Sequence, residues 1–232
     1  MRRAIICFTR APIPGQTKTR LMPRLTGEQC AGLHRAFLRD LSRAFAQVDA
    51  DLYIAYTPEG GEAALREIFP AARALFPQRG EDLGSRMEGA LDRVLDLGYG
   101  ACVLVGADLP LLSPGHLEAA FAALERAEVT LGPTPDGGYY LVGLRRPCPC
   151  LFAGQVYGVG TVYEQALSAL RRVGASFAPS PPCADVDTPE DLAALWWALR
   201  GRDTATARFL EKLVQGGGVP RGSDAVSEVC DQ

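Results

Sequence analysis

The sequence predicts an α/β protein built on a mainly parallel sheet. Short apolar runs alternate along the chain with segments whose apolar residues recur at helical spacing, the pattern of strands joined by crossover helices. The run over residues 101–106 is apolar throughout, as in a central parallel strand covered on both faces. Successive parallel strands are expected to connect through right-handed crossovers.

The remaining elements follow in order along the chain. The apolar run at residues 4–8 predicts the first strand, and Thr26-Gly27-Glu28-Gln29 has the spacing of a capping box that begins a helix over about 26–47. Further strands are expected near residues 51–56, 73–76, 129–132, 139–144 and 175–178. Further helices are expected near residues 62–69, from the end of the segment 78–87 to about 97, near 114–125, near 162–173 and over most of 189–215. We expect one domain over 1–215, and the glycine-rich polar segment 216–232 predicts a flexible tail.

The composition narrows the class of protein. The 232 residues are 47% hydrophobic and 22% charged, which is ordinary for a globular protein with a sizeable core. The net charge of −3 argues against a general nucleic-acid binder. No apolar run approaches the ~20 residues of a membrane helix, and the run after Arg3 is too short for a signal peptide. We therefore expect a cytoplasmic protein with neither a nucleic-acid nor a membrane partner.

The cysteines and histidines give little sign of a site. The seven cysteines are odd in number and irregularly spaced, which is typical of reduced cytoplasmic thiols. Cys148 and Cys150 are a weak zinc signal, because no second pair or nearby histidine accompanies them. The two histidines, His34 and His116, fall in or near predicted helices and are expected to be bystanders.

The segment after the first strand is the first candidate binding site. Arg10, Lys18 and Arg20 place three cations in a loop without an acidic residue, which suits the phosphates of a nucleotide. The alternative is a solvated cationic loop. The loop is not a P-loop, because Thr17 and Ile13 stand where that motif has glycine. A dinucleotide fingerprint is also absent.

Carboxylates form the second candidate site. Asp108 directly follows the strand at 101–106, where open parallel sheets bind ligands, and a carboxylate there can hold Mg²⁺ or Mn²⁺. Asp185 and Asp187 alternate in an extended segment, so one of them can share the metal with Asp108. The alternative readings are a strand-end turn for Asp108 and a helix start after Asp187.

Two further segments are ambiguous from the residues alone. Asp136-Gly137-Gly138 permits close approach of the backbone to a ligand, and Asp136 is suited to bind a hydroxyl, but Asp-Gly is also an ordinary turn signal. Asp82 or Ser85 can cap a helix whose first amides are suited to cradle a base or a phosphate. Arg86 either adds positive charge there or pairs with an acid.

Together these segments resemble a known family. The chain is similar to the bacterial nucleotide-diphospho-sugar-transferase-like proteins, a GT-A-type group often labelled arsenosugar biosynthesis glycosyltransferases. More distantly, its N-terminal loop is similar to those of molybdenum-cofactor and phospholactate guanylyltransferases. The motifs that carry the resemblance occur in order over residues 4 to about 195. They are Arg10-Ala11-Pro12, Gly15, Lys18-Thr19-Arg20-Leu21, Gln78, Gly80, Asp82-Leu83-Gly84, Arg86-Met87, Gly106-Ala107-Asp108-Leu109-Pro110, Gly132-Pro133, Asp136-Gly137-Gly138-Tyr139-Tyr140 and Asp185-Val186-Asp187-Thr188.

The resemblance implies a fold and a set of roles. The fold is a Rossmann-like, three-layer αβα sheet of the GT-A type, with a nucleotide over the first strand. Lys18 would lie on the nucleotide's phosphates, Asp108 would hold the metal, and Asp187 would be a second metal ligand. The nucleotide-binding set is Arg10, Ala11, Pro12, Gly15, Lys18, Arg20, Gly80, Asp82, Leu83, Gly84 and Arg86. The acceptor or sugar set is Asp136, Gly137, Gly138, Tyr139 and Tyr157.

One segment departs from the family pattern. The family usually has Trp-Ser-Thr or Trp-Gly-Thr before the helix near residue 162, whereas this chain has Tyr157-Gly158-Val159-Gly160 and lacks the hydroxyl at Val159. The departure concerns the acceptor or sugar contacts more than the nucleotide.

The function predicted first is a metal-dependent glycosyltransferase that uses a nucleotide-activated sugar and a small-molecule acceptor. Its catalytic residues would be Lys18, Asp108 and Asp136, with Asp136 as the base that inverting glycosyl transfer requires. The first alternative is a nucleotidyltransferase that moves a nucleoside monophosphate from a nucleoside triphosphate to a phosphorylated acceptor, which needs no base. The second alternative is a nucleotide-binding module without catalysis.

Overall fold

The computed structural model describes residues 1–215, so the predicted tail at 216–232 lies outside the described residues. A seven-stranded sheet runs through this part of the chain in the order β3-β2-β1-β4-β6-β5-β7. The strands are β1 (Arg3–Arg10), β2 (Asp51–Thr57), β3 (Ala74–Pro77), β4 (Ala101–Gly106), β5 (Val129–Pro133), β6 (Tyr139–Leu144) and β7 (Phe177–Pro179). Only β6 runs antiparallel to its neighbours, β4 and β5. The sheet is therefore mainly parallel, as predicted.

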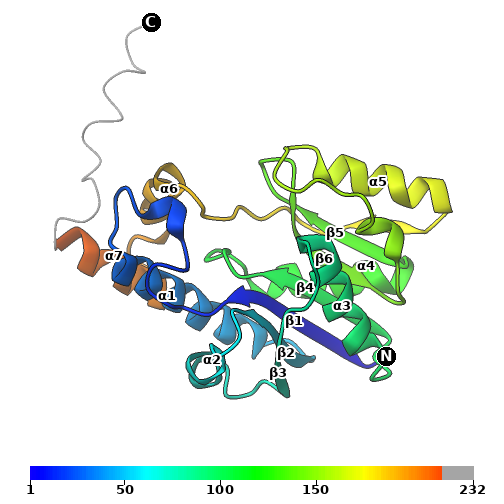
Figure 1. The fold of residues 1–232 in the computed structure, drawn as a ribbon, viewed down its shortest axis with the longest axis horizontal. Helices are drawn as coiled ribbons and strands as arrows, with labels where there is room; N and C mark the ends of the chain where they lie inside the picture. The colour runs from blue at the N-terminus through cyan, green and yellow to red at the C-terminus, as the bar shows by residue number, and fades with distance from the viewer. Residues whose placement is uncertain (216–232) are drawn as a thin grey trace, which may run out of the picture.

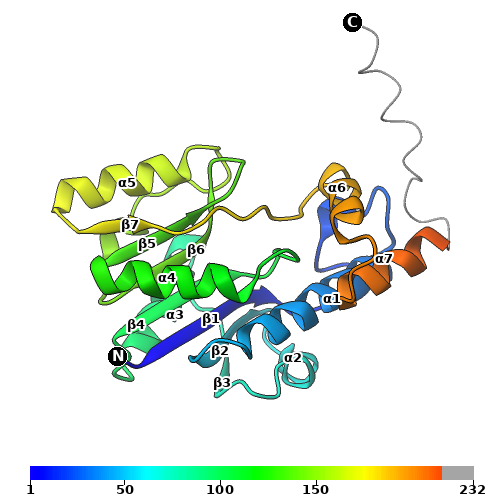
Figure 2. The ribbon, with the colours of Figure 1, turned by 180° about the vertical axis from the view of Figure 1, so that it is seen from behind.

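Helices cover both faces of the sheet (Figure 1 and Figure 2). They are α1 (Gly27–Phe45), α2 (Glu62–Ile68), α3 (Leu83–Leu95), α4 (Pro114–Arg126), α5 (Val162–Val173), α6 (Pro189–Leu199) and α7 (Ala205–Gln215), with short 3₁₀ turns at Thr19–Leu21 and Pro149–Leu151. Figure 2 shows α1, α2 and α4 on one face, and Figure 1 shows α3 on the other. The predicted three-layer α/β fold is confirmed.

The alternation of side chains along the strands builds two cores. On β1, Ile5 and Cys7 point to the face covered by α1, α2 and α4, whereas Ala4 and Ile6 point to the face covered by α3 and α5. All four side chains are fully buried, because a central parallel strand has a helical layer on each side. Thr26 and Gln29 form the predicted capping box at the start of α1.

A third apolar cluster joins α6 and α7 to the outer side of α1. Phe37 on α1 packs there with Leu195 on α6 and Leu210 on α7. Asp40 on α1 accepts hydrogen bonds from the first backbone amides of α7, so the two helices are also tied by a side-chain cap. None of the helices within residues 1–215 is long and apolar enough to span a membrane.

The topology places three distant segments at one edge of the sheet. From β1 the chain order proceeds to β2 and β3 on one side, while β4 lies on the other side, so a topological switch point falls between β1 and β4. The extended segment before α6 returns to this point, where the amide of Val186 donates to the carbonyl of Asp108 at 2.9 Å. The ends of β1 and β4 and the Asp185–Asp187 segment therefore meet, although they lie far apart in sequence.

Candidate active site

A cavity of about 430 Å³ opens at the carboxyl ends of β1 and β4. Its position is the one that open parallel sheets offer to ligands. Of the residues predicted to act in a site, eight line it: Arg10, Lys18, Arg20, Leu83, Arg86, Asp108, Tyr139 and Asp187. The structure therefore brings the cationic loop, the acidic segments and the start of α3 together.

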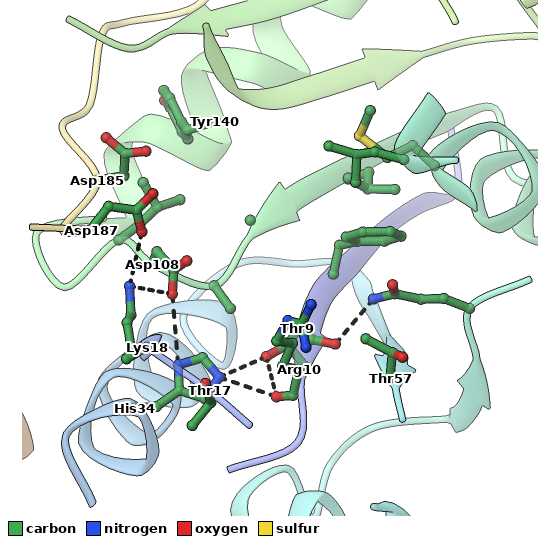
Figure 3. Close-up of a pocket in the computed structure, with 18 of the residues that line it drawn as sticks. Thr9, Arg10, Thr17, Lys18, His34, Thr57, Asp108, Tyr140, Asp185 and Asp187 are labelled. Atoms are coloured by element: carbon green, nitrogen blue, oxygen red, sulfur yellow. Dashed lines mark hydrogen bonds and ion pairs between the residues drawn. The ribbon is translucent and has the colours of Figure 1, made fainter. Parts of the chain in front are cut away.

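Lys18 lies at the centre of the charged side of this cavity (Figure 3). Its ammonium is 2.6 Å from Asp108 Oδ1 and 3.4 Å from Asp187 Oδ1, and it also donates to the Val186 carbonyl. The side chain is only 3% exposed. Its backbone is left-handed, with φ of 51°. Within residues 1–215, no other non-glycine residue has a positive φ. Strain of this kind is found where the surroundings hold a functional group in place.

The carboxylates surround this ammonium and remain open to the cavity. Burial pushes the pKa of Asp108 up, but Lys18, with a smaller effect from Arg10, holds it below its ordinary value. Asp187 pairs with Arg20 as well as Lys18. Asp185 also lines the cavity, and burial together with the neighbouring carboxylates, Asp187 first, raises its pKa to about 6. Asp108, Asp185 and Asp187 thus line one cavity, and their sharing of a metal ion stays a prediction.

The sequence predicts a bystander at His34, and the structure places this side chain at the cavity. It is buried on α1 beside Lys18 and lines the cavity. Its Nε2 lies 3.1 Å from both Thr9 Oγ1 and the Arg10 carbonyl, and its Nδ1 is 3.7 Å from Asp108 Oδ1. Its sequence signal, a polar residue on the buried face of an amphipathic helix, is too common to identify a site.

Part of the cavity wall is apolar and consists of Phe8, Leu83, Met87, Leu104 and Val142. Gln78, a motif residue to which the sequence assigns no role, also lines the cavity. Its amide nitrogen donates to the carbonyls of Thr9 and Ala55, at 3.0 Å each. Because both of these partners can only accept, the amide is oriented with its oxygen free for a ligand.

Several residues predicted to bind the nucleotide lie outside the cavity lining. Ala11 and Pro12 are buried, and Gly15 is exposed with φ of 76°. Gly80 has φ of 142°, and a Cβ there would lie 2.5 Å from Ser85 Oγ. None of these four lines the cavity.

The start of α3 has the same kind of structural explanation. The Asp82 carboxylate accepts from the Ser85 amide at 2.7 Å in a capping box, and it does not line the cavity. A Cβ at Gly84 would lie 3.0 Å from the Phe152 carbonyl and 3.1 Å from the Tyr157 hydroxyl. Gly84 therefore allows the segment containing Phe152 and Tyr157 to approach α3 closely.

The predicted acceptor residues are also placed differently from expectation. Asp136 Oδ1 accepts hydrogen bonds from Thr134 Oγ1 and from the Gly138 amide, so its carboxylate stabilises a turn. Asp136, Gly137, Gly138 and Tyr157 do not line the cavity. Tyr157 instead contacts Tyr139, which does, through hydroxyls 3.4 Å apart. Val159, where the family hydroxyl is missing, is 49% exposed and also lies outside the cavity lining.

Cys148 and Cys150 lie away from this site. Their sulfurs are 3.5 Å apart and border a separate cavity of about 270 Å³. Within residues 1–215, no group of three or more His, Cys, Asp or Glu side chains is arranged to hold a metal ion. The structure thus supplies no further ligands to the weak zinc signal.

Comparison with known proteins assigns the chain to a family. A family model described as "Uncharacterized protein conserved in bacteria (DUF2064)" matches residues 40–159, about half of the chain. The chain belongs to the DUF2064 family. This match covers α3, Asp108 and the cavity wall formed by β4 and β6, and it does not include the loop with Lys18.

Relatives that match nearly the whole chain are enzymes. A 2-phospho-L-lactate guanylyltransferase of Methanothermobacter thermautotrophicus is 30% identical over 89% of this chain and 90% of its own length. A phosphoenolpyruvate guanylyltransferase of Rubrobacter xylanophilus is 30% identical over 77% of this chain and 86% of its own length. A crystal structure from Desulfovibrio desulfuricans G20, named as a nucleotide-diphospho-sugar transferase, superposes with a TM-score of 0.86 at 32% identity and covers 93% of this chain and 96% of that one. With relatives of this identity and coverage, the chain is a transferase.

Proposed function

We propose that this transferase moves a nucleoside monophosphate from a nucleoside triphosphate to a small phosphorylated acceptor and releases pyrophosphate. The observation that carries the proposal is the pair of guanylyltransferases at 30% identity, which match 89% and 77% of this chain. Nucleotidyl transfer is the first of the two alternatives that the sequence leaves open. It replaces glycosyl transfer as the function that we favour.

The cationic loop is suited to the triphosphate. An oxygen of the acceptor phosphate would attack the α-phosphorus, the bond from that phosphorus to the bridging β-oxygen would break, and pyrophosphate would leave. Lys18, Arg10 and Arg20 line the cavity and can neutralise the charge that develops on the leaving group. Lys18 is the best placed of the three, because burial strengthens its electrostatic effect.

A divalent metal ion fits the acidic part of the cavity. Asp108 and Asp187 line the cavity and offer hard oxygen ligands, their side chains are 42% and 38% exposed, and they already attract one cation, the ammonium of Lys18. We propose that these two carboxylates would hold Mg²⁺ or Mn²⁺. When bound, the ion would supply charge neutralisation to the phosphates.

The placement of Asp136 supports nucleotidyl over glycosyl transfer. Inverting glycosyl transfer needs a base that faces the acceptor hydroxyl, whereas an acceptor phosphate is already ionised. The Asp136 carboxylate is bonded within its own turn and lies outside the cavity lining. The base predicted from the sequence is thus engaged elsewhere.

We further propose that the nucleotide is GTP. The apolar part of the cavity wall is suited to a base, and the free amide oxygen of Gln78 can accept a hydrogen bond from it. Guanine carries adjacent N–H donors on its pairing edge. The names of the two guanylyltransferase relatives point to the same base.

The test is pyrophosphate release across a panel of substrates. The four common nucleoside triphosphates are each offered with 2-phospho-L-lactate, phosphoenolpyruvate or no acceptor, with and without Mg²⁺. We expect release that requires GTP, an acceptor and the metal ion. No release from any triphosphate, together with acceptor-dependent release of a nucleoside diphosphate from a nucleotide-sugar, would overturn the proposal in favour of the glycosyl transfer that the name of the structural relative suggests.

A further inference from the structure

His34 is a buried polar residue of the site for which the proposed reaction has no role. It is 2% exposed and lies on α1, between the end of β1 and the end of β4 (Figure 3). Its two ring nitrogens face different segments: Nε2 faces Thr9 and Arg10, and Nδ1 faces Asp108. One side chain thus lies between the end of β1 and the loop that follows β4.

The hydrogen bonds of Nε2 determine the tautomer of the ring. The Arg10 carbonyl can only accept, and it lies 3.1 Å from Nε2. The Thr9 hydroxyl gives its own hydrogen to the same carbonyl at 2.7 Å, so it too acts as an acceptor toward the ring. Nε2 must therefore carry the hydrogen. Its bond holds the last residues of β1, from which the cationic loop begins.

Nδ1 is consequently an acceptor beside the central ion pair. It is buried, has no hydrogen-bond partner within the described residues, and faces Asp108 Oδ1 across 3.7 Å. Two acceptors that face each other are stable only next to a donor or a positive charge. The Lys18 ammonium, 2.6 Å from the same carboxylate oxygen, supplies that charge. A neutral ring also spares Lys18 the repulsion that a second buried cation would cause.

We propose that His34 is a positioning residue for the nucleotidyl transfer, with a separate task for each ring nitrogen, an inference that rests on the proposed function. Through Nε2–H it holds the end of β1, so that the loop with Arg10 and Lys18 is ready to receive the triphosphate. Through Nδ1, an unprotonated acceptor beside Asp108, it keeps the Lys18–Asp108 ion pair in position during transfer.

Two amide substitutions separate the two tasks. Glutamine places its nitrogen near the position of Nε2, and asparagine places its amide near that of Nδ1. We expect His34→Gln to keep the Kd for GTP close to that of the wild type and to lower kcat about tenfold. We expect His34→Asn to raise the Kd for GTP about tenfold and to lower kcat less. If His34 were purely structural, both variants would have a lower Tm, and Kd and kcat would change alike in the two. That result would overturn the proposal.

A second measurement does not depend on activity. The sequence has two histidines, so a His116→Gln variant is enough to assign the ¹⁵N spectra of the labelled rings. The His116 ring caps α4 and lies outside the cavity lining. We expect His34 at neutral pH to be protonated at Nε2 and unprotonated at Nδ1. The opposite tautomer or a doubly protonated ring would overturn the assignment. If this tautomer and the contrast in GTP binding are observed but no pyrophosphate is released, the proposed function fails, whereas the role of Nε2–H in holding the end of β1 stands.

Discussion

At the residue scale, the account depends on Lys18. A non-glycine residue in the left-handed region costs about 1 kcal/mol or more, and this chain accepts that cost at a buried lysine. The ion pairs with Asp108 and Asp187 and the bond to the Val186 carbonyl offset the strain and fix the ammonium. The conformation therefore presents a rigid positive charge to the cavity, which suits the stabilisation of a leaving group.

Replacing Lys18 with methionine tests this charge. Methionine keeps much of the volume, so we expect the fold to persist while kcat falls by on the order of 10²-fold or more. Steady-state kinetics of pyrophosphate release measure the effect. The matched control is Lys212→Met, because Lys212 is the other lysine of the chain and is exposed on α7. Equal activity in the two variants would contradict the role of Lys18.

Sequence patterns identify some site residues and miss others for a physical reason. Lys18, Asp108 and Asp187 stand in charged loop segments whose residues together carry a family resemblance. His34 and Gln78 line the cavity and form hydrogen bonds to Thr9, 25 and 69 residues away in the chain, and no local pattern reports such a contact. Asp136 lies outside the cavity lining, and its placement could not be predicted because a turn carboxylate and a catalytic one look alike in sequence.

At the element scale, the Gly137–Gly138 turn illustrates how a glycine pair can serve packing. The pair was expected to let the backbone approach a ligand. Gly137 has φ of 85°, and a Cβ there would lie 2.0 Å from the Gly160 carbonyl oxygen. The Gly137 carbonyl also accepts from the Tyr163 amide at the start of α5 at 3.0 Å. The close approach is therefore between two segments of the chain itself.

Gly137→Ala should cost more stability than an ordinary glycine substitution. The variant adds both left-handed strain and a backbone clash, so we expect a loss of about 2–4 kcal/mol in the free energy of unfolding. Gly158→Ala is the control, because Gly158 has φ of 82° with open space around its Cβ and should lose only about 1 kcal/mol. Urea unfolding compares the two. Equal losses would show that the approach to Gly160 is not a constraint.

At the scale of the whole molecule, the order of the strands makes the site. The switch point between β1 and β4 leaves a crevice, and the segment before α6 crosses back to close it with Asp185 and Asp187. The fold class and nearly all element positions could be predicted, because apolar runs and helical periodicity are local. The antiparallel direction of β6 and the return of the 185–187 segment depend on tertiary packing, which no local pattern contains.

The most direct test of the proposed function is to identify the product by mass spectrometry. The protein is given GTP, GDP-mannose, Mg²⁺ and a phosphorylated hydroxy acid together, and Asp108→Asn serves as the matched variant. We predict an acceptor heavier by one guanosine monophosphate unit, with one equivalent of pyrophosphate, at a rate lowered on the order of 10²-fold or more in Asp108→Asn. An acceptor that instead carries a hexose, with release of GDP, would contradict nucleotidyl transfer.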